Sequence, residues 1–274
     1  MMEIFNAVLC ETGSVSKNCP MPAVKTSPFD PADLVARFRA EALRQGFREE
    51  PFSSCVGVTL SAFTKRTVGH LPRIYLSSGV HGDEPAPPEA LLQALREGVF
   101  DDRATWFLVP MLNPTGFVNN QRDSAEGIDL NRDYLSRKSR EVSDHVHWLN
   151  RQPRFDLALC LHEDWEAQGF YLYELVQTQD EDYCRSIRTA VADVLPIEQG
   201  NVIDGRPVAE PGIIRPESDP ALREQWPEAI YLFKYHTAHC LTFETPTPRP
   251  LQDRIDGQLV AMRRAIDQTF NTPR

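Results

Sequence analysis

The sequence of 274 residues lacks several features that would place it in a specialised class. Its six cysteines are scattered, without a C-x-x-C pair or a close cluster, so we expect six reduced thiols and no catalytic cysteine. No window approaches the roughly 18 apolar residues of a membrane helix, and the first residues lack the basic and apolar parts of a signal peptide. These absences predict a soluble, cytoplasmic protein without a membrane partner.

The sequence also contains fewer basic than acidic residues. Lysine and arginine number 29 against 39 acidic residues, which gives a net charge of −10, and no basic block offsets it locally. This balance argues against a nucleic acid as the main partner. With 41% hydrophobic residues and no repeat or convincing linker, the chain is expected to form one domain over residues 1–274. Its composition leaves assembly into a homo-oligomer open.

Alternating strand and helix patterns predict the architecture. Residues 30–46 begin with an aspartate cap and a proline and carry apolar residues on one face, which predicts a helix within an N-terminal extension, residues 1–50. Later strands, such as 106–112 and 155–161, alternate with helical segments. We therefore expect an α/β domain with a mixed, mostly parallel twisted sheet and helices on both faces. Residues 196–226 are rich in proline, glycine and charge and are expected to form a substrate loop.

A histidine and a glutamate follow the apolar strand 73–80. His81 and Glu84 are three positions apart, and an imidazole and a carboxylate at the mouth of a sheet can bind one zinc ion. His162 and Glu244 each end another apolar strand. Because ligands in open α/β sheets bind outside the carboxyl ends of the strands, these side chains can converge. The sequence therefore predicts a catalytic metal site.

Other histidines offer rival metal sites. A helix-borne zinc protease motif would need a histidine four residues after His162, where this chain has a glutamate, so that motif is excluded. His145 and His147 are expected on an exposed helix face, where residues two apart do not converge. His236 and His239 form a further pair. We expect both pairs to be structural.

Taken together, these motifs resemble the zinc metallocarboxypeptidases of the carboxypeptidase A type. The resemblance covers roughly residues 72–248, and its motifs include the loop 113–133, which contains Asn-Pro and Asp-Leu-Asn-Arg-Asp. It implies a zinc carboxypeptidase-like fold of the phosphorylase/hydrolase type. The short spacing between the two histidines is similar to that of compact bacterial relatives, such as murein-peptide amidases and the succinylglutamate desuccinylase/aspartoacylase branch.

The resemblance also implies a set of catalytic roles. It makes His81, Glu84 and His162 the ligands of one zinc ion, with a water molecule in the open position. Glu244 would be the general base that takes the proton of this water and returns it to the leaving amine. Arg122 would stabilise the oxyanion of the tetrahedral intermediate.

Substrate binding follows from the same resemblance. Asn131 and Arg132 would bind the terminal carboxylate of the substrate, for which a guanidinium group is geometrically suited. An Asx-turn with a surface salt bridge is the alternative interpretation of this loop. Tyr231 and Tyr235 are candidates for the tyrosine with which larger members of the family close on their substrates, although both also fit a core.

Acidic residues follow the second predicted ligand. Glu163, Asp164 and Glu166 would add negative potential beside the metal. This arrangement suggests that the substrate carries a positive group or that a second metal binds.

The function predicted from these residues is zinc-dependent hydrolysis of an amide bond next to a carboxylate-bearing residue, in a peptide or peptide-like molecule. The first alternative is an N-acyl amino-acid deacylase that uses the same site. The second is a non-catalytic binding protein stabilised by a metal.

Overall fold

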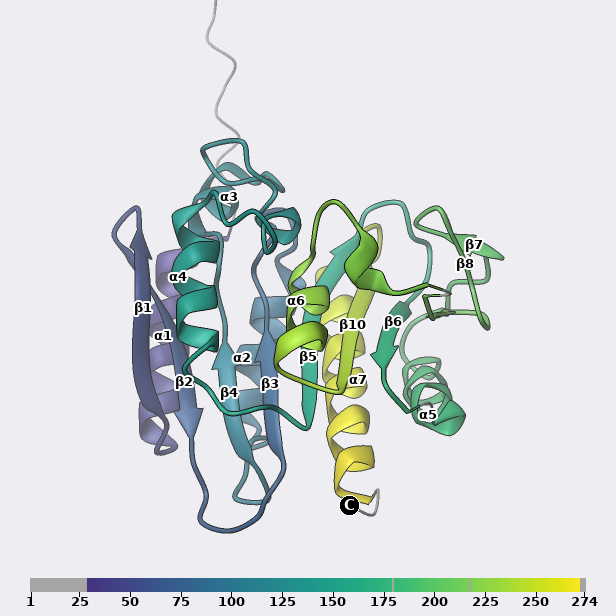
Figure 1. Ribbon diagram of the computed structural model, residues 1–274, viewed down its shortest axis with the longest axis horizontal. Coiled ribbons are helices and arrows are strands. Elements are labelled where there is room, and N and C mark those ends of the chain that lie inside the picture. Colours follow the sequence, from purple (N-terminus) through teal and green to yellow (C-terminus); the bar gives the residue numbers. More distant parts are fainter. Residues whose placement is uncertain (1–28, 179, 217, 272–274) are drawn as a thin grey trace, which may run out of the picture.

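The computed structural model describes residues 29–178, 180–216 and 218–271, which form a sheet covered by helices on both faces (Figure 1). The helices are α1 (Pro31–Arg44), α2 (Ala86–Arg96), α3 (Pro114–Asn119), α4 (Arg140–Leu149), α5 (Glu181–Val191), α6 (Glu228–Tyr235) and α7 (Leu251–Asn271), with 3-10 turns η1 (Leu130–Arg132) and η2 (Pro220–Leu222). The strands are β1 (Arg48–Cys55), β2 (Val58–Lys65), β3 (Arg73–Ser77), β4 (Thr105–Val109), β5 (Leu157–Asp164), β6 (Tyr171–Val176), β7 (Val202–Ile203), β8 (Arg206–Pro207), β9 (Ile213–Ile214) and β10 (His239–Pro246).

The main sheet has the strand order β1-β2-β4-β3-β5-β10-β6-β9. Its centre, from β4 through β3 and β5 to β10, is parallel, whereas β1 and β2 form an antiparallel hairpin at one edge and β6 runs antiparallel to β10. Helices α4 and α6 cover the face toward the viewer in Figure 1, and α1, α2 and α7 cover the other. The predicted single α/β domain with a mixed, mostly parallel sheet is confirmed.

The first predicted helix is also confirmed. The Asp30 side chain accepts hydrogen bonds from two backbone N–H groups of the first turn, and Leu34, Phe38 and Ala42 are buried against the sheet. The next segment, β1, belongs to the sheet itself, so the predicted extension over 1–50 is not helical throughout. Residues 1–28, with Cys10 and Cys19, lie outside the described residues.

The cysteines of the described ranges, Cys55, Cys160, Cys184 and Cys240, are free thiols. Burial raises the pKa of the Cys55 thiol to about 11, which disfavours the nucleophilic thiolate. None of the helices in these ranges has both the length and the apolar character that crossing a membrane requires.

Two strands extend further than the sequence suggested. His162 was expected just after a strand, and Glu244 at the last position of another, but β5 continues to Asp164 and β10 to Pro246. The parallel register pairs Glu244 directly with His162. Because side chains alternate between the faces of a strand, this pairing brings the two side chains to the same face of the sheet.

Helix α6 was not predicted, because its residues are mostly apolar and show little helical periodicity. It packs on the sheet beside β5, β6 and β10. The predicted position of His145 on an exposed helix face is wrong. Its side chain is buried between Tyr75 and Tyr134, with which it forms hydrogen bonds, so its role in the described structure is structural, as expected.

Candidate metal centre and active site

His81, Glu84 and His162 converge at the carboxyl ends of β3 and β5. Nδ1 of His81 lies 2.5 Å from one carboxylate oxygen of Glu84, and Nδ1 of His162 lies 3.1 Å from the other. All three side chains are buried, and their ligand atoms lie within 4.8 Å of one another. No other group of this kind occurs in the described ranges. Two imidazoles and one carboxylate form a donor set of the kind found in catalytic zinc sites.

Close packing of two glycines fixes the loop that carries His81 and Glu84. Gly82 lies against the first turn of α3, and a Cβ atom added to it would come within 1.9 Å of the carbonyl carbon of Gly116. Only glycine fits at such a contact. The loop is therefore held against α3, and Glu84 stands two residues before α2.

The outer nitrogen of His81 contacts a residue that sequence reasoning did not assign. Nε2 of His81 lies 3.3 Å from Asp129, which also accepts hydrogen bonds from Nε of Arg122 and from the backbone N–H of Asn131, both at 2.9 Å. A carboxylate behind a metal-binding imidazole fixes the tautomer and the ring orientation. In the sequence, the position of Asp129 two residues before Asn131 could have indicated a role at the site. An Asx-turn explains the same spacing, and the structure contains this turn as well.

Charges around the site shift its carboxyl groups in opposite directions. Burial pushes the pKa of Glu84 upward, but His81 and His162 outweigh it and hold the pKa below the usual range. Burial raises the pKa of Glu244 well above its ordinary value, with further repulsion from Glu84 and Asp164. The site therefore combines an ionised carboxylate between two imidazoles with a second carboxyl group that readily holds a proton.

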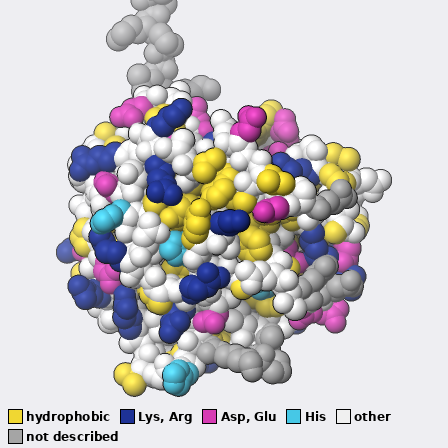
Figure 2. All heavy atoms as spheres, viewed as in Figure 1, with side chains coloured by type: hydrophobic (Ala, Val, Ile, Leu, Met, Phe, Trp, Pro, Cys, Tyr) yellow, Lys and Arg dark blue, Asp and Glu magenta, His cyan; other side chains and the backbone are white. Residues whose placement is uncertain are grey.

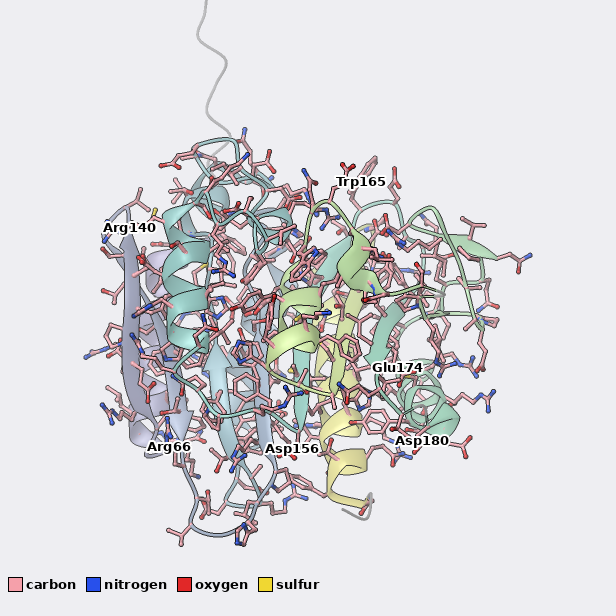
Figure 3. The ribbon with its side chains drawn as sticks, viewed as in Figure 1. Arg66, Arg140, Asp156, Trp165, Glu174 and Asp180 are labelled. Carbon is pink, nitrogen blue, oxygen red and sulfur yellow. The ribbon has the colours of Figure 1, made fainter. Side chains whose placement is uncertain are left out.

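A cavity of about 350 Å³ opens over these residues. Its floor is formed by the converging side chains, and its rim includes Trp165, which is 71% exposed and stands at the upper edge in Figure 3. Asp204, Pro220 and Arg223 extend from the 196–226 segment into the lining. On the face shown in Figure 2, apolar side chains gather in the upper centre, the region where Figure 1 places α6 and the loop before it.

The predicted substrate-binding side chains all line this cavity. Arg122 is held by Asp129, and its NH1 lies 3.6 Å from the Glu84 carboxylate. Arg132 donates to the backbone carbonyl of Asn131 at 3.0 Å, and no ion pair of its side chain occurs in the described ranges. The cavity thus presents the guanidinium groups of Arg122 and Arg132 in addition to that of Arg223, and Arg122 lies nearest to a candidate metal ligand.

The acidic residues that follow His162 differ in their partners, and Glu163 is paired with a cation. Its carboxylate points to the other face of β5, where it forms an ion pair with Arg254 of α7 and accepts a hydrogen bond from the backbone N–H of Ala86. Its charge is therefore compensated. Asp164 does line the cavity, where it accepts a hydrogen bond of 2.8 Å from the Tyr171 hydroxyl group.

The two tyrosines considered for closing over the substrate do not line the cavity. Tyr231 is buried among aromatic residues, and Tyr235 lies on the last turn of α6. The cavity contains Tyr171 and Tyr173 of β6 instead, and the hydroxyl group of Tyr173 donates to Asp204 at 2.5 Å.

The fold and the site together define a hydrolase of the metallocarboxypeptidase-like class. A structure from Shewanella amazonensis described as a metallopeptidase is 25% identical and has a TM-score of 0.76, covering 86% of this chain and 91% of that one. A metallo-carboxypeptidase from Burkholderia cenocepacia shares the fold at 17% identity, with a TM-score of 0.65 and coverage of 89% and 70%. Carboxypeptidase SOL1 of Arabidopsis thaliana is 30% identical over an alignment of 113 residues, and the match covers 33% of this chain and 23% of that protein.

The chain belongs to the succinylglutamate desuccinylase/aspartoacylase catalytic domain family, whose model matches residues 70–214. This range contains the three candidate metal ligands and two arginines of the cavity, Arg122 and Arg132, but not Arg223. It ends before β10, which carries Glu244.

Proposed function

We propose that the protein is a zinc-dependent amide hydrolase that removes a carboxylate-bearing residue from a peptide or a peptide-like small molecule. The observation that carries this proposal is the convergence of His81, Glu84 and His162 in one buried donor set, with Glu244 on the adjacent strand. The similarity to a metallopeptidase and to carboxypeptidases supports the same reaction class.

His81, Glu84 and His162 would hold the zinc ion. Their residue types fit it, because imidazole nitrogen and carboxylate oxygen are common zinc ligands and three protein ligands leave a position for water. When bound, zinc supplies a Lewis acid that polarises the scissile carbonyl group and lowers the pKa of water to about 7. Asp129 orients His81 by accepting the hydrogen of Nε2, which leaves Nδ1 free as a ligand.

Glu244 would act as the general base. Its carboxylate takes a proton from the attacking water and then donates it to the nitrogen of the leaving amine. Two features support this role: its pairing with His162 across β5 and β10, and a pKa that burial raises well above the ordinary value. A raised pKa makes the carboxylate a stronger acceptor for the proton of the water.

Arg122, Asn131 and Arg132 would bind the substrate. Arg122, held in place by Asp129, would stabilise the negative charge that develops on the scissile carbonyl oxygen. Arg132 and the amide of Asn131 would bind the terminal carboxylate, for which the guanidinium group of Arg132 is available. The 196–226 segment would act as the substrate loop, since several of its residues line the cavity.

An N-acyl amino-acid deacylase is the second candidate. The family match favours it, because the family is defined by a desuccinylase and an aspartoacylase. The same groups would cleave the amide bond, but the released fragments would be an acyl acid and a free amino acid.

Metal analysis and a substrate panel test both candidates. The panel contains C-terminal dipeptides, a murein tripeptide and N-acyl amino acids, and it is assayed with wild type and Glu244→Gln. We expect about one zinc ion per chain and loss of hydrolysis by at least roughly 100-fold in the variant, as is usual when a general base is removed. Absence of a divalent metal, or unchanged hydrolysis by Glu244→Gln, contradicts the mechanism. Zinc binding without any turnover favours a metal-stabilised binding protein.

A further inference from the structure

Glu228, the first residue of α6, is a buried carboxyl group close to the cavity but outside the proposed catalytic set. Its side chain is 1% exposed and forms no ion pair in the described ranges. The hydroxyl groups of Tyr75 and Ser77, both on β3, donate to its two oxygens at 2.6 and 2.8 Å. A carboxyl group buried without a cation is costly unless it is hydrogen-bonded. These two bonds therefore fasten the start of α6 to the centre of the sheet.

A directional chain of hydrogen bonds supports this attachment. Because the Tyr75 hydrogen is donated to Glu228, Nε2 of His145 must donate to the Tyr75 oxygen, at 3.1 Å. Nδ1 of His145 then accepts from the hydroxyl group of Tyr134, at 2.9 Å. Burial lowers the pKa of His145 to about 3, which keeps the ring neutral and its tautomer fixed. All four side chains are buried, so water does not compete for these bonds.

The backbone of Glu228 connects this network to the cavity. The N–H groups in the first turn of a helix have no partner within the helix, and that of Glu228 donates to Oδ1 of Asn131 at 2.9 Å. The amide oxygen of Asn131 is thereby engaged, and its Nδ2 lies 3.5 Å from Nε2 of His162, with a second N–H left for the substrate. The opposite orientation would present an amide oxygen to an incoming carboxylate and repel it.

We propose that Glu228 is a positioning residue for carboxylate recognition: its attachment to β3 places the first N–H group of α6 so that Asn131 presents its amide N–H to the substrate. This inference rests on the proposed function, in which Asn131 binds the terminal carboxylate. The same attachment fixes Ala229 and Ile230, the next two residues of α6, in the wall of the cavity.

Binding of a carboxylate and of its amide counterpart tests the proposal. The probes are N-acetyl-leucine and N-acetyl-leucinamide, whose side chain suits the apolar part of the wall. Their dissociation constants are measured by calorimetry in zinc-loaded Glu244→Gln protein, in which the ligand is not consumed. We expect this parent to prefer the acid, and Glu228→Gln to reduce that preference roughly tenfold, the loss expected for one misdirected charge-assisted hydrogen bond. Binding of the amide should change less than twofold.

Glu174→Gln is the matched control. Glu174, labelled in Figure 3, is an equally buried carboxylate on β6, but it is paired with Arg215 and His239 and has no contact with Asn131. The control should lower thermal stability and leave the acid preference unchanged. If Glu228→Gln behaves in the same way, its role is only structural and the proposal is wrong. A parent protein without any preference for the acid overturns it as well.

Tyr75→Phe is the second variant and carries the test if Glu228→Gln does not fold. It removes one of the two hydroxyl donors to Glu228 and should reduce the acid preference in the same direction. Retention of the full preference in a folded Tyr75→Phe protein counts against the proposal. If wild type hydrolyses nothing while the variants lose the acid preference as expected, the proposed function fails and the positioning role stands.

Discussion

Replacement of Asp129 by alanine should weaken metal binding although Asp129 is not a ligand. The variant removes the acceptor of the His81 Nε2 hydrogen, the partner of Arg122 and the acceptor of the Asn131 backbone N–H. His81 would then be free to rotate or change tautomer, so fewer molecules would present Nδ1 to the metal.

The expected loss of metal affinity in Asp129→Ala can be estimated from the contacts of Asp129. Loss of such a supporting carboxylate costs 10- to 100-fold in metal affinity, which corresponds to about 1.4–2.8 kcal/mol. Arg122 should lose its fixed position at the same time, so kcat/KM of the zinc-saturated variant should also fall by roughly tenfold or more.

The assay is a competition for zinc between the protein and a chromophoric chelator, followed by kinetics at saturating zinc. Asp156→Ala is the control, because Asp156 accepts a hydrogen bond from the backbone N–H of Arg73, the first residue of β3. Figure 3 places Asp156 at the lower end of the sheet, away from Trp165 at the cavity rim. Zinc affinity within twofold of wild type in Asp129→Ala would refute the reasoning, whereas a loss in both variants would indicate general destabilisation.

Three further predictions concern stability. Because the pKa of His145 is about 3 in the folded state and about 6.5 when unfolded, the unfolded chain binds more protons between these values, and stability must rise with pH there. Metal-free wild type should lose about 1.4 kcal/mol more unfolding free energy than His145→Gln between pH 7.5 and 5.5 in urea titrations, and equal losses contradict this assignment. Gly82→Ala should lower the free energy of unfolding by about 3 kcal/mol or more, because the added Cβ would meet backbone atoms. Gly257→Ala should cost less in the same titration, because its Cβ would mainly meet the movable end of the Leu195 side chain. Arg254→Ala should lower the free energy of unfolding by about 3–5 kcal/mol, because it leaves Glu163 buried and unpaired. The double variant Arg254→Met/Glu163→Gln should recover most of this loss. Wild-type stability of Arg254→Ala would show that the ion pair is unimportant.

The sequence pattern was sufficient to predict the fold class and to identify the residues that converge at the candidate site. Apolar strands followed by polar side chains indicate both the sheet and its reactive edge, so His81, Glu84 and His162 could be selected before any geometry was known. Helix α6 was missed because it is apolar on most sides and its sequence lacks the periodicity of an amphipathic helix.

Contacts between segments that are distant in the sequence could not be predicted from the sequence alone. Glu163 belongs to an acidic run in sequence, but the alternation of side chains along β5 turns it toward Arg254, 91 residues away. His145 shares the buried face of α4 with Val142, Val146 and Leu149, but its hydrogen-bond partners Tyr75 and Tyr134 come from other segments. Asp129 contacts His81 from 48 residues away in the sequence, and this distance hides the pairing from an analysis of local spacing.

The pairing of β5 with β10 makes the geometry of the site an all-or-none property. Glu244 stands beside His162 because Cys240 to Pro246 match Ala158 to Asp164 one for one. A slip of a single residue would exchange the two faces of β10, so that Phe243 or Thr245 would stand where the carboxylate is needed. Mutations that loosen the pairing of β5 with β10 should therefore yield either competent or inert molecules, and not a graded series of weakened ones.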